Sequence, residues 1–167
     1  MIARNTMIEN SAYSTLPPSL RELDLQDSRQ CRTDSNVAHL AHLVTLRKLN
    51  LMHNAAVTGE TLHLLSDTIE EVDLFGCNVT KKGIEGVATK PYLRRVSLST
   101  LNGRLYHGTR RTALIKECIE CLIEKHPAIY IELDKTSLDD LRKNYPGASF
   151  LKNCRVTNNL CYDVVST

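Results

Sequence analysis

The sequence lacks the features of three protein classes. No apolar run approaches the ~20 residues that a membrane-spanning helix needs, so we expect a soluble protein with no membrane partner. The formal charge is only +2, so we expect no nucleic-acid binding except through an assembly. The first residues, MIARNTMIENSAYS, lack the apolar segment of a secretory signal.

The cysteines indicate a reducing compartment. There are six in 167 residues, thinly spread, and we interpret them as free thiols of an intracellular protein. We expect a cytoplasmic location. A mitochondrial presequence stays open as the alternative, because Arg4 is followed by Ser and Asn residues, although Glu9 argues against it.

The chain contains a repeat. Four segments, LRELDL, LRKLNL, IEEVDL and LRRVSL, carry apolar residues at their first, fourth and sixth positions. They begin at Leu20, Leu46, Ile69 and Leu93. Between them, a threonine is followed by aliphatic residues four and seven positions later, as at the N-cap and buried face of a short helix. These threonines are Thr33, Thr58 and Thr80.

This pattern resembles the leucine-rich repeats of the cysteine-containing, ribonuclease-inhibitor-like class found in F-box substrate receptors. The segment VDLFGCNVTKKGIEGVA is its nearest copy. The resemblance implies a short right-handed α/β solenoid with a parallel sheet on its concave face. It also implies that Ser28, Asn54 and Cys77, at the ninth position of each unit, hold the turn after the strand. A reactive or metal-bound Cys77 is the alternative.

Beyond the fourth strand the units become irregular. We predict a helix over 112–126, a strand in AIYIELD, a helix capped by Ser137 and a last strand in ASFLKNC. The predicted organisation is a flexible segment 1–15, four repeats over 16–101, a basic loop 102–111, degenerate capping units over 112–157 and a tail 158–167.

The concave face is the predicted partner-binding surface. Third positions form a row of alternating charge, and fifth positions form a polar stripe. Met52 and Phe75 are expected to lie exposed side by side, as in a binding hot spot. The candidate partner-binding residues are Asp24, Asn50, Met52, Asp73, Phe75 and Arg95.

The loop before the predicted helix is basic. It carries Arg104, His107, Arg110 and Arg111, and Arg94 and Arg95 precede it on the fourth strand. It is either a solvated connection or a site for an anion or an acidic partner.

These patterns favour a non-catalytic interaction module, acting as a scaffold or a subunit of a larger intracellular assembly, with no cofactor and no small-molecule substrate. One alternative is substrate recognition in a ubiquitin-ligase pathway without an F-box of its own, and another is a secreted bacterial effector. A third is a thiol or zinc-dependent enzyme using Cys118, Cys121 and His126, with Cys154 or Cys161 as a further ligand.

Overall fold

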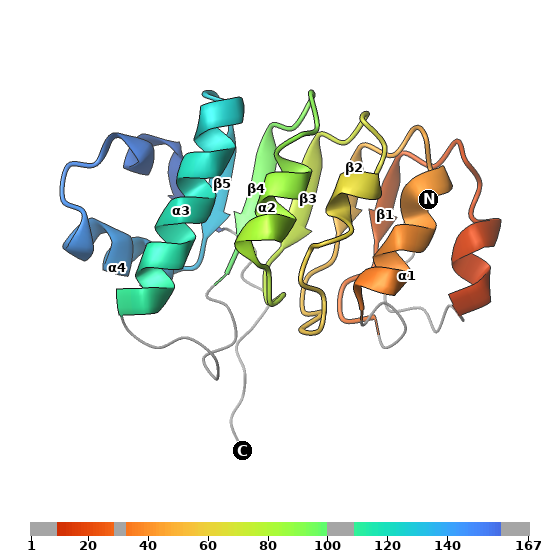
Figure 1. Cartoon of the computed structure of the whole chain (residues 1–167), viewed down its shortest axis with the longest axis horizontal. Coiled ribbons are helices and arrows are strands. Elements are labelled where there is room, and N and C mark those ends of the chain that lie inside the picture. Colours follow the sequence, from red (N-terminus) through yellow and green to blue (C-terminus); the bar gives the residue numbers. More distant parts are fainter. Residues whose placement is uncertain (1–9, 29–32, 100–108, 158–167) are drawn as a thin grey trace, which may run out of the picture.

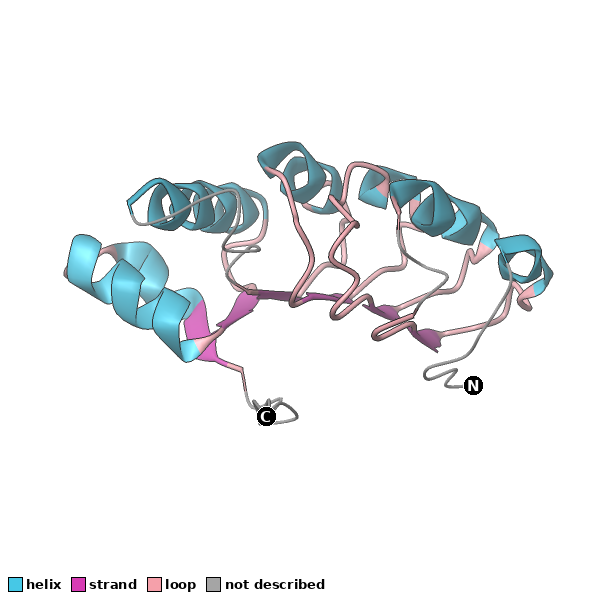
Figure 2. Ribbon diagram, turned by 90° about the horizontal axis from the view of Figure 1, so that it is seen from below, coloured by secondary structure: helices cyan, strands magenta, loops and turns pink. Residues whose placement is uncertain are grey.

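The computed structural model describes residues 10–28, 33–99 and 109–157, which form one curved sheet with helices on one side (Figures 1 and 2). All six strands are parallel and follow one another in chain order across the sheet. They are β1 (Glu22–Asp24), β2 (Lys48–Asn50), β3 (Glu71–Leu74), β4 (Arg95–Leu98), β5 (Tyr130–Leu133) and β6 (Cys154–Val156).

The connections form a second layer that covers one face of the sheet, as Figure 2 shows. It contains four α-helices, α1 (Asp34–Ala38), α2 (Lys81–Val87), α3 (Thr109–Lys125) and α4 (Lys135–Asn144). It also contains four 3₁₀ helices, η1 (Asn10–Thr15), η2 (His39–His42), η3 (Leu62–Leu64) and η4 (Ser149–Asn153).

The core lies between the two layers, where the repeat places it. The first, fourth and sixth residues of every repeat point at the helices and are at most 5% exposed. In the third repeat these are Ile69, Val72 and Leu74. Burying one such side chain contributes roughly 1.5–3 kcal/mol, and no single repeat can bury its own set without its neighbours.

The predicted repeat register is confirmed. Glu22 pairs with Lys48, Lys48 with Glu71, and Glu71 with Arg95, so equal positions of the four repeats form straight rows across the sheet. β5 and β6 extend the same rows, with Tyr130 beside Arg95. The C-terminal units therefore continue the solenoid, and its sheet is open.

Two predicted features of the first half are wrong. Residues 10–15 form η1, with Tyr13 fully buried in the core, so a flexible segment does not extend to residue 15. Thr58 caps no α-helix, unlike Thr33 and Thr80. Its N–H and hydroxyl donate to Asp34 Oδ2 at 3.0 and 2.6 Å, and Gly59 follows with a φ of +83° that no helix accommodates.

The C-terminal boundaries also differ from the prediction. α3 begins at Thr109, and α4 is capped by Asp134, whose Oδ1 accepts from the Ser137 N–H at 2.8 Å. Ser137 is therefore inside the helix and not its cap. Residues 149–153 form η4, and the last strand begins only at Cys154.

Candidate partner-binding surface

The candidate surface is the concave face of the sheet, opposite the helices (Figure 2). Among the described residues, no helix or strand lies over this face. It is built from the third and fifth residues of each repeat, which point away from the core because side chains alternate along a strand.

The third-position charges pair with each other, as the alternating signs predict. Lys48 Nζ lies 3.2 Å from Glu22 Oε1, and the Arg95 guanidinium lies 3.2 Å from Glu71 Oε2. These side chains are largely or partly exposed, so each pair contributes at most about 1 kcal/mol.

The fifth-position residues have a structural role that the sequence interpretation missed. Oδ1 of Asp24, Asn50 and Asp73 accepts a hydrogen bond from the backbone N–H two residues later, at 3.0, 2.9 and 3.0 Å. Each side chain thus holds the bend that ends its strand. Burial raises the pKa of the Asp73 carboxyl, while the Phe75 N–H and Arg95 oppose that rise.

The chain turns sharply at the eighth position. Asp27, His53 and Gly76 occupy it, all with φ between +49° and +77°. At Gly76 a Cβ would lie 2.6 Å from His53 Nδ1, so the third repeat needs glycine there. Burial lowers the pKa of His53, and Asp27 opposes this shift.

The predicted Met52–Phe75 hot spot is wrong. Met52 is only 3% exposed, and Phe75 is half-buried with its ring edge-on to His53, 6.0 Å between centroids. The physical reason is that both residues stand immediately before the left-handed bend, where the strand no longer runs flat. They do not offer an exposed apolar pair to a partner.

The predicted basic loop does not form one unit. Arg110 and Arg111 belong to the first turn of α3, whereas the loop was expected to extend to residue 111. Arg104 and His107 lie outside the described residues, so their role as an anion or acidic-partner site stays a prediction.

The concave face is hollowed toward its C-terminal end. A cavity of ≈ 210 Å³ opens over β3, β4, β5 and β6. Tyr130 stands beside it with 56% of its surface exposed, next to Arg95 in the same row. The lining residues are Glu71, Arg94, Arg95, Ala128, Tyr130, Glu132 and Arg155. We call this site the arginine hollow.

Ion pairs hold the arginine hollow in shape. Arg95 donates to Glu71 at 3.2 Å and to Glu132 at 2.7 Å, and so joins β3 to β5. Arg94 donates to Glu71 at 2.7 Å. Glu132 Oε2 also accepts from the hydroxyls of Ser97 and Thr157. Both carboxylates of the hollow are therefore occupied by its own donors.

Of the predicted site residues that the structure describes, only Arg95 and Asp73 lie at or beside the arginine hollow, and Asp24 and Asn50 lie toward the other end of the sheet. Tyr130 and Arg155 were missed. A register signal could have found them, because aligning AIYIELD with LRRVSL on their buried residues places Tyr130 in the third-position row. Arg155 follows in the fifth-position row beside Glu132.

The ninth-position residues Asn54 and Cys77 hold their turns, as the family resemblance implies. Asn54 Nδ2 donates to the backbone oxygens of Leu25 and Leu51 at 2.9 and 2.8 Å. The Cys77 thiol, 1% exposed, donates to Leu51 O at 3.0 Å. Cys77 therefore takes the place of an asparagine.

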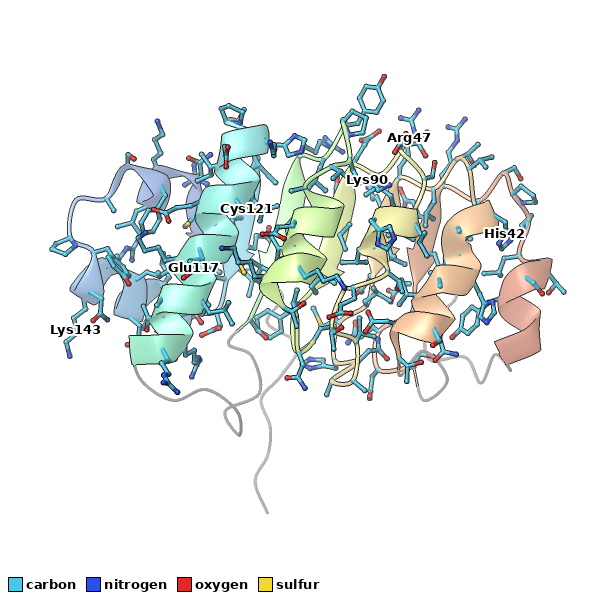
Figure 3. The ribbon with its side chains drawn as sticks, viewed as in Figure 1. His42, Arg47, Lys90, Glu117, Cys121 and Lys143 are labelled. Carbon is cyan, nitrogen blue, oxygen red and sulfur yellow. The ribbon has the colours of Figure 1, made fainter. Side chains whose placement is uncertain are left out.

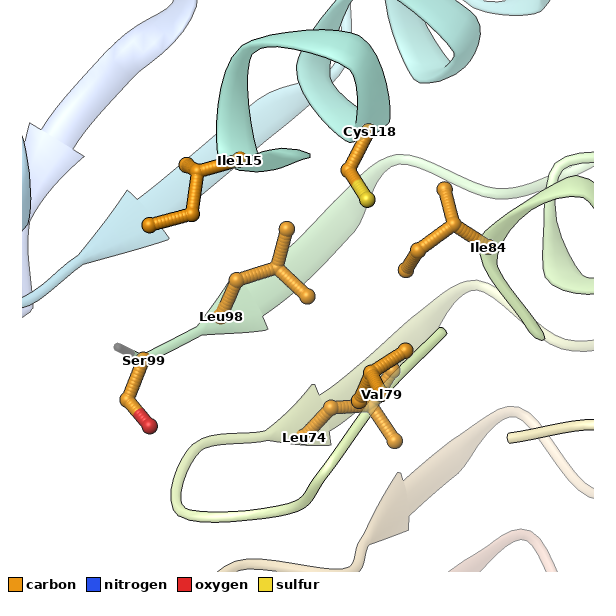
Figure 4. A pocket seen from close by; sticks show the side chains of 7 residues that line it. All are labelled: Leu74, Val79, Ile84, Leu98, Ser99, Ile115 and Cys118. Atoms are coloured by element: carbon orange, nitrogen blue, oxygen red, sulfur yellow. The ribbon is translucent and has the colours of Figure 1, made fainter. Parts of the chain in front are cut away.

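The other cysteines lie in apolar surroundings. Cys118 points from α3 toward Leu98 and Ile84, beside a cavity of only ≈ 10 Å³ (Figure 4). Burial raises the pKa of Cys118 to about 12 and that of Cys154 to about 11, which disfavours the thiolate that a nucleophile or zinc ligand requires. Cys121 lies with Glu117 on α3 in the outer helix layer (Figure 3), and Cys161 is outside the described residues.

His126, the third residue of the hypothetical zinc site, hydrogen-bonds through Nε2 to Ala88 O at 3.0 Å. Within the described ranges, no group of three or more His, Cys, Asp or Glu side chains is arranged to hold a metal ion. No helix in that part of the chain is both long and apolar enough to cross a membrane.

Comparison with known proteins agrees with this geometry. A family model described as Leucine Rich repeat matches residues 42–62 and 66–88, which contain the second and third repeats. Together with the six-stranded parallel sheet, this makes the chain an α/β leucine-rich-repeat solenoid. The match indicates a protein–protein interaction module and names no particular receptor class. No curated protein matches the chain.

Proposed function

We propose that this chain is a non-catalytic interaction module that binds a protein partner with the C-terminal half of its concave face. The arginine hollow carries the proposal. It combines a recess in an uncovered sheet with an exposed tyrosine and three arginines. Tyrosine and arginine are the side chains that most often dominate the energy of a protein interface.

The hollow is also held rigid before a partner arrives. The pairs from Arg95 to Glu71 and Glu132 fix the floor across three strands, so little side-chain freedom remains to be lost on binding. We infer that the partner belongs to a larger intracellular assembly, in which the chain acts as a scaffold or subunit. The buried thiols of Cys118 and Cys154, whose pKa is raised by burial, favour a non-catalytic module over a thiol enzyme.

Site-specific photo-crosslinking tests the proposal. A benzophenone amino acid is placed at Tyr130 on the concave face, and in a matched variant at Leu64, which is 44% exposed on η3 in the helix layer. In cells of the native source, we expect a discrete crosslinked adduct from position 130 and none from position 64. An adduct from position 64 alone would overturn the proposed face.

A further inference from the structure

One arginine of the hollow has no carboxylate partner among the described residues, although Glu70, just outside the lining, brings a further carboxylate to Arg94 at 3.2 Å. Its lining carries three arginines and two glutamates. Each glutamate is paired with Arg94, Arg95 or both at 2.7–3.2 Å. Arg155 lies beside them on β6, and within the described part of the chain no carboxylate lies in ion-pair distance of it.

Arg155 is held over the hollow by an aromatic ring. Its guanidinium carbon lies 5.8 Å from the centroid of the Tyr130 ring, a cation–π contact that favours this position of the side chain without using its N–H donors. Among the described residues, no carboxylate takes these donors, which suit a planar acceptor. A guanidinium on an aromatic face binds a carboxylate through two parallel hydrogen bonds.

We propose that the arginine hollow recognises an acidic peptide segment, in which one Asp or Glu carboxylate pairs with Arg155 and an adjoining apolar side chain packs on Tyr130. This inference rests on the proposed function and names the chemistry of its partner. A basic segment is disfavoured because Glu71 and Glu132 already accept from Arg94, Arg95, Ser97 and Thr157. An acidic side chain meets the one arginine of the hollow that has no carboxylate of its own among the described residues.

Nuclear magnetic resonance titration of the full ¹⁵N-labelled chain tests this inference. The probe is the blocked peptide acetyl-Glu-Glu-Leu-Glu-Glu-amide, and the matched probe has glutamine at each glutamate. We expect saturable shifts of the Arg155 side-chain Nε–H and of β5 and β6 backbone signals with the first peptide only. The shifts should shrink as salt rises, because exposed charges are screened.

Variants complete the test. Arg155→Gln removes the guanidinium and should weaken binding of the glutamate peptide roughly tenfold, as expected for loss of charge-assisted hydrogen bonds. Arg142→Gln is the control, because Arg142 is an exposed arginine on α4 in the outer layer. It should leave the affinity unchanged. Both substituted side chains are exposed, and the spectrum of each variant reports whether its fold is intact.

The inference is overturned if the glutamine peptide gives the same shifts, if Arg142 and Arg155 respond alike, or if Arg155→Gln binds as tightly as the wild type. This outcome is separable from failure of the proposed function. A crosslink from position 130 with no binding of the glutamate peptide retains the concave site and rejects the acidic ligand. Absence of both rejects the two proposals together.

Discussion

At the scale of single residues, three positions of the repeat control the ends of β1, β2 and β3. The fifth residue accepts from the backbone two residues later, the eighth takes a left-handed conformation, and the ninth bonds to carbonyls of its own and the preceding repeat. Of these three positions, only the ninth is assigned to the turn by the family resemblance. The fifth-position residues were predicted to bind a partner. The sequence does not distinguish an outward-pointing polar side chain that bonds to the backbone from one that binds a ligand.

Replacing Asn54 by alanine should destabilise the fold by about 2–3 kcal/mol. The change removes the two buried hydrogen bonds from Asn54 Nδ2 to Leu25 O and Leu51 O, each worth about 1 kcal/mol, and leaves a void in place of the buried side chain. Urea unfolding followed by circular dichroism measures the loss. Asn78→Ala, at a half-buried asparagine in the following repeat, is the control and should change stability by less than about 0.5 kcal/mol.

Replacing Asp73 by asparagine should stabilise the protein at neutral pH by about 0.5 kcal/mol. Burial raises the pKa of Asp73 above its ordinary 3.8, so the stability it contributes is complete below pH 3.8 and is lost as pH rises through the folded-state value. Asparagine keeps the acceptor for the Phe75 N–H, as Asn50 does for Met52. Unfolding at pH 7 and at pH 3.5 should show the gain only at pH 7.

The opposite dependence is expected from His53. Burial lowers the pKa of His53 below its ordinary 6.5, so its contribution is complete above pH 6.5 and is lost as pH falls through the folded-state value. Melting temperatures between pH 7.5 and 5 should fall less in His53→Asn than in the wild type, since asparagine tolerates the positive φ. His39→Asn, in η2 on the surface, should keep the wild-type slope.

At the scale of elements, strands were easier to predict than helices. The first, fourth and sixth residues of each repeat determine strand position, because burial on one face admits only one register. The second repeat lacks the predicted α-helix, although it has the same threonine, because Asp34 of the first repeat binds the N–H groups of Thr58 and Gly59 at 3.0 and 2.8 Å. No pattern within one repeat reports a contact made by its neighbour.

The backbone at Thr58 and Gly59 also approaches α2 so closely that Gly83 of this helix has to be a glycine. A Cβ at Gly83 would lie 2.5 Å from Thr58 O and 2.9 Å from Gly59 Cα, so Gly83→Ala should destabilise by more than about 2 kcal/mol despite alanine's better helix propensity. At Gly86, in the same helix, the nearest contact is 3.3 Å, to His63. Thermal unfolding of the two variants should show a much smaller change for Gly86→Ala; equal effects would contradict the close approach.

At the scale of the whole molecule, the repeat predicted the solenoid and its concave surface but not which part of that surface is open. The partner-binding residues predicted from the sequence extend from Asp24 on β1 to Arg95 on β4 and include Met52, which is buried. The exposed aromatic and the recess lie over β3–β6, because the degenerate C-terminal units continue the sheet and bring Tyr130 and Arg155 beside Arg95. Tyr130 and Arg155 lie near Arg95 only because β4, β5 and β6 pair in the correct register, although Arg95 and Arg155 are 60 residues apart in the sequence.

We propose that the partner binds at the arginine hollow and not on the helix layer. The most direct measurement is affinity purification from the native source with the wild type, Tyr130→Ala/Arg155→Ala and the outer-layer control Arg142→Ala, each confirmed to be folded. We predict a stoichiometric partner with the wild type and the control, and its loss with the double variant, since hot-spot truncation costs about 2 kcal/mol or more per residue. Retention of the partner by the double variant would contradict this account.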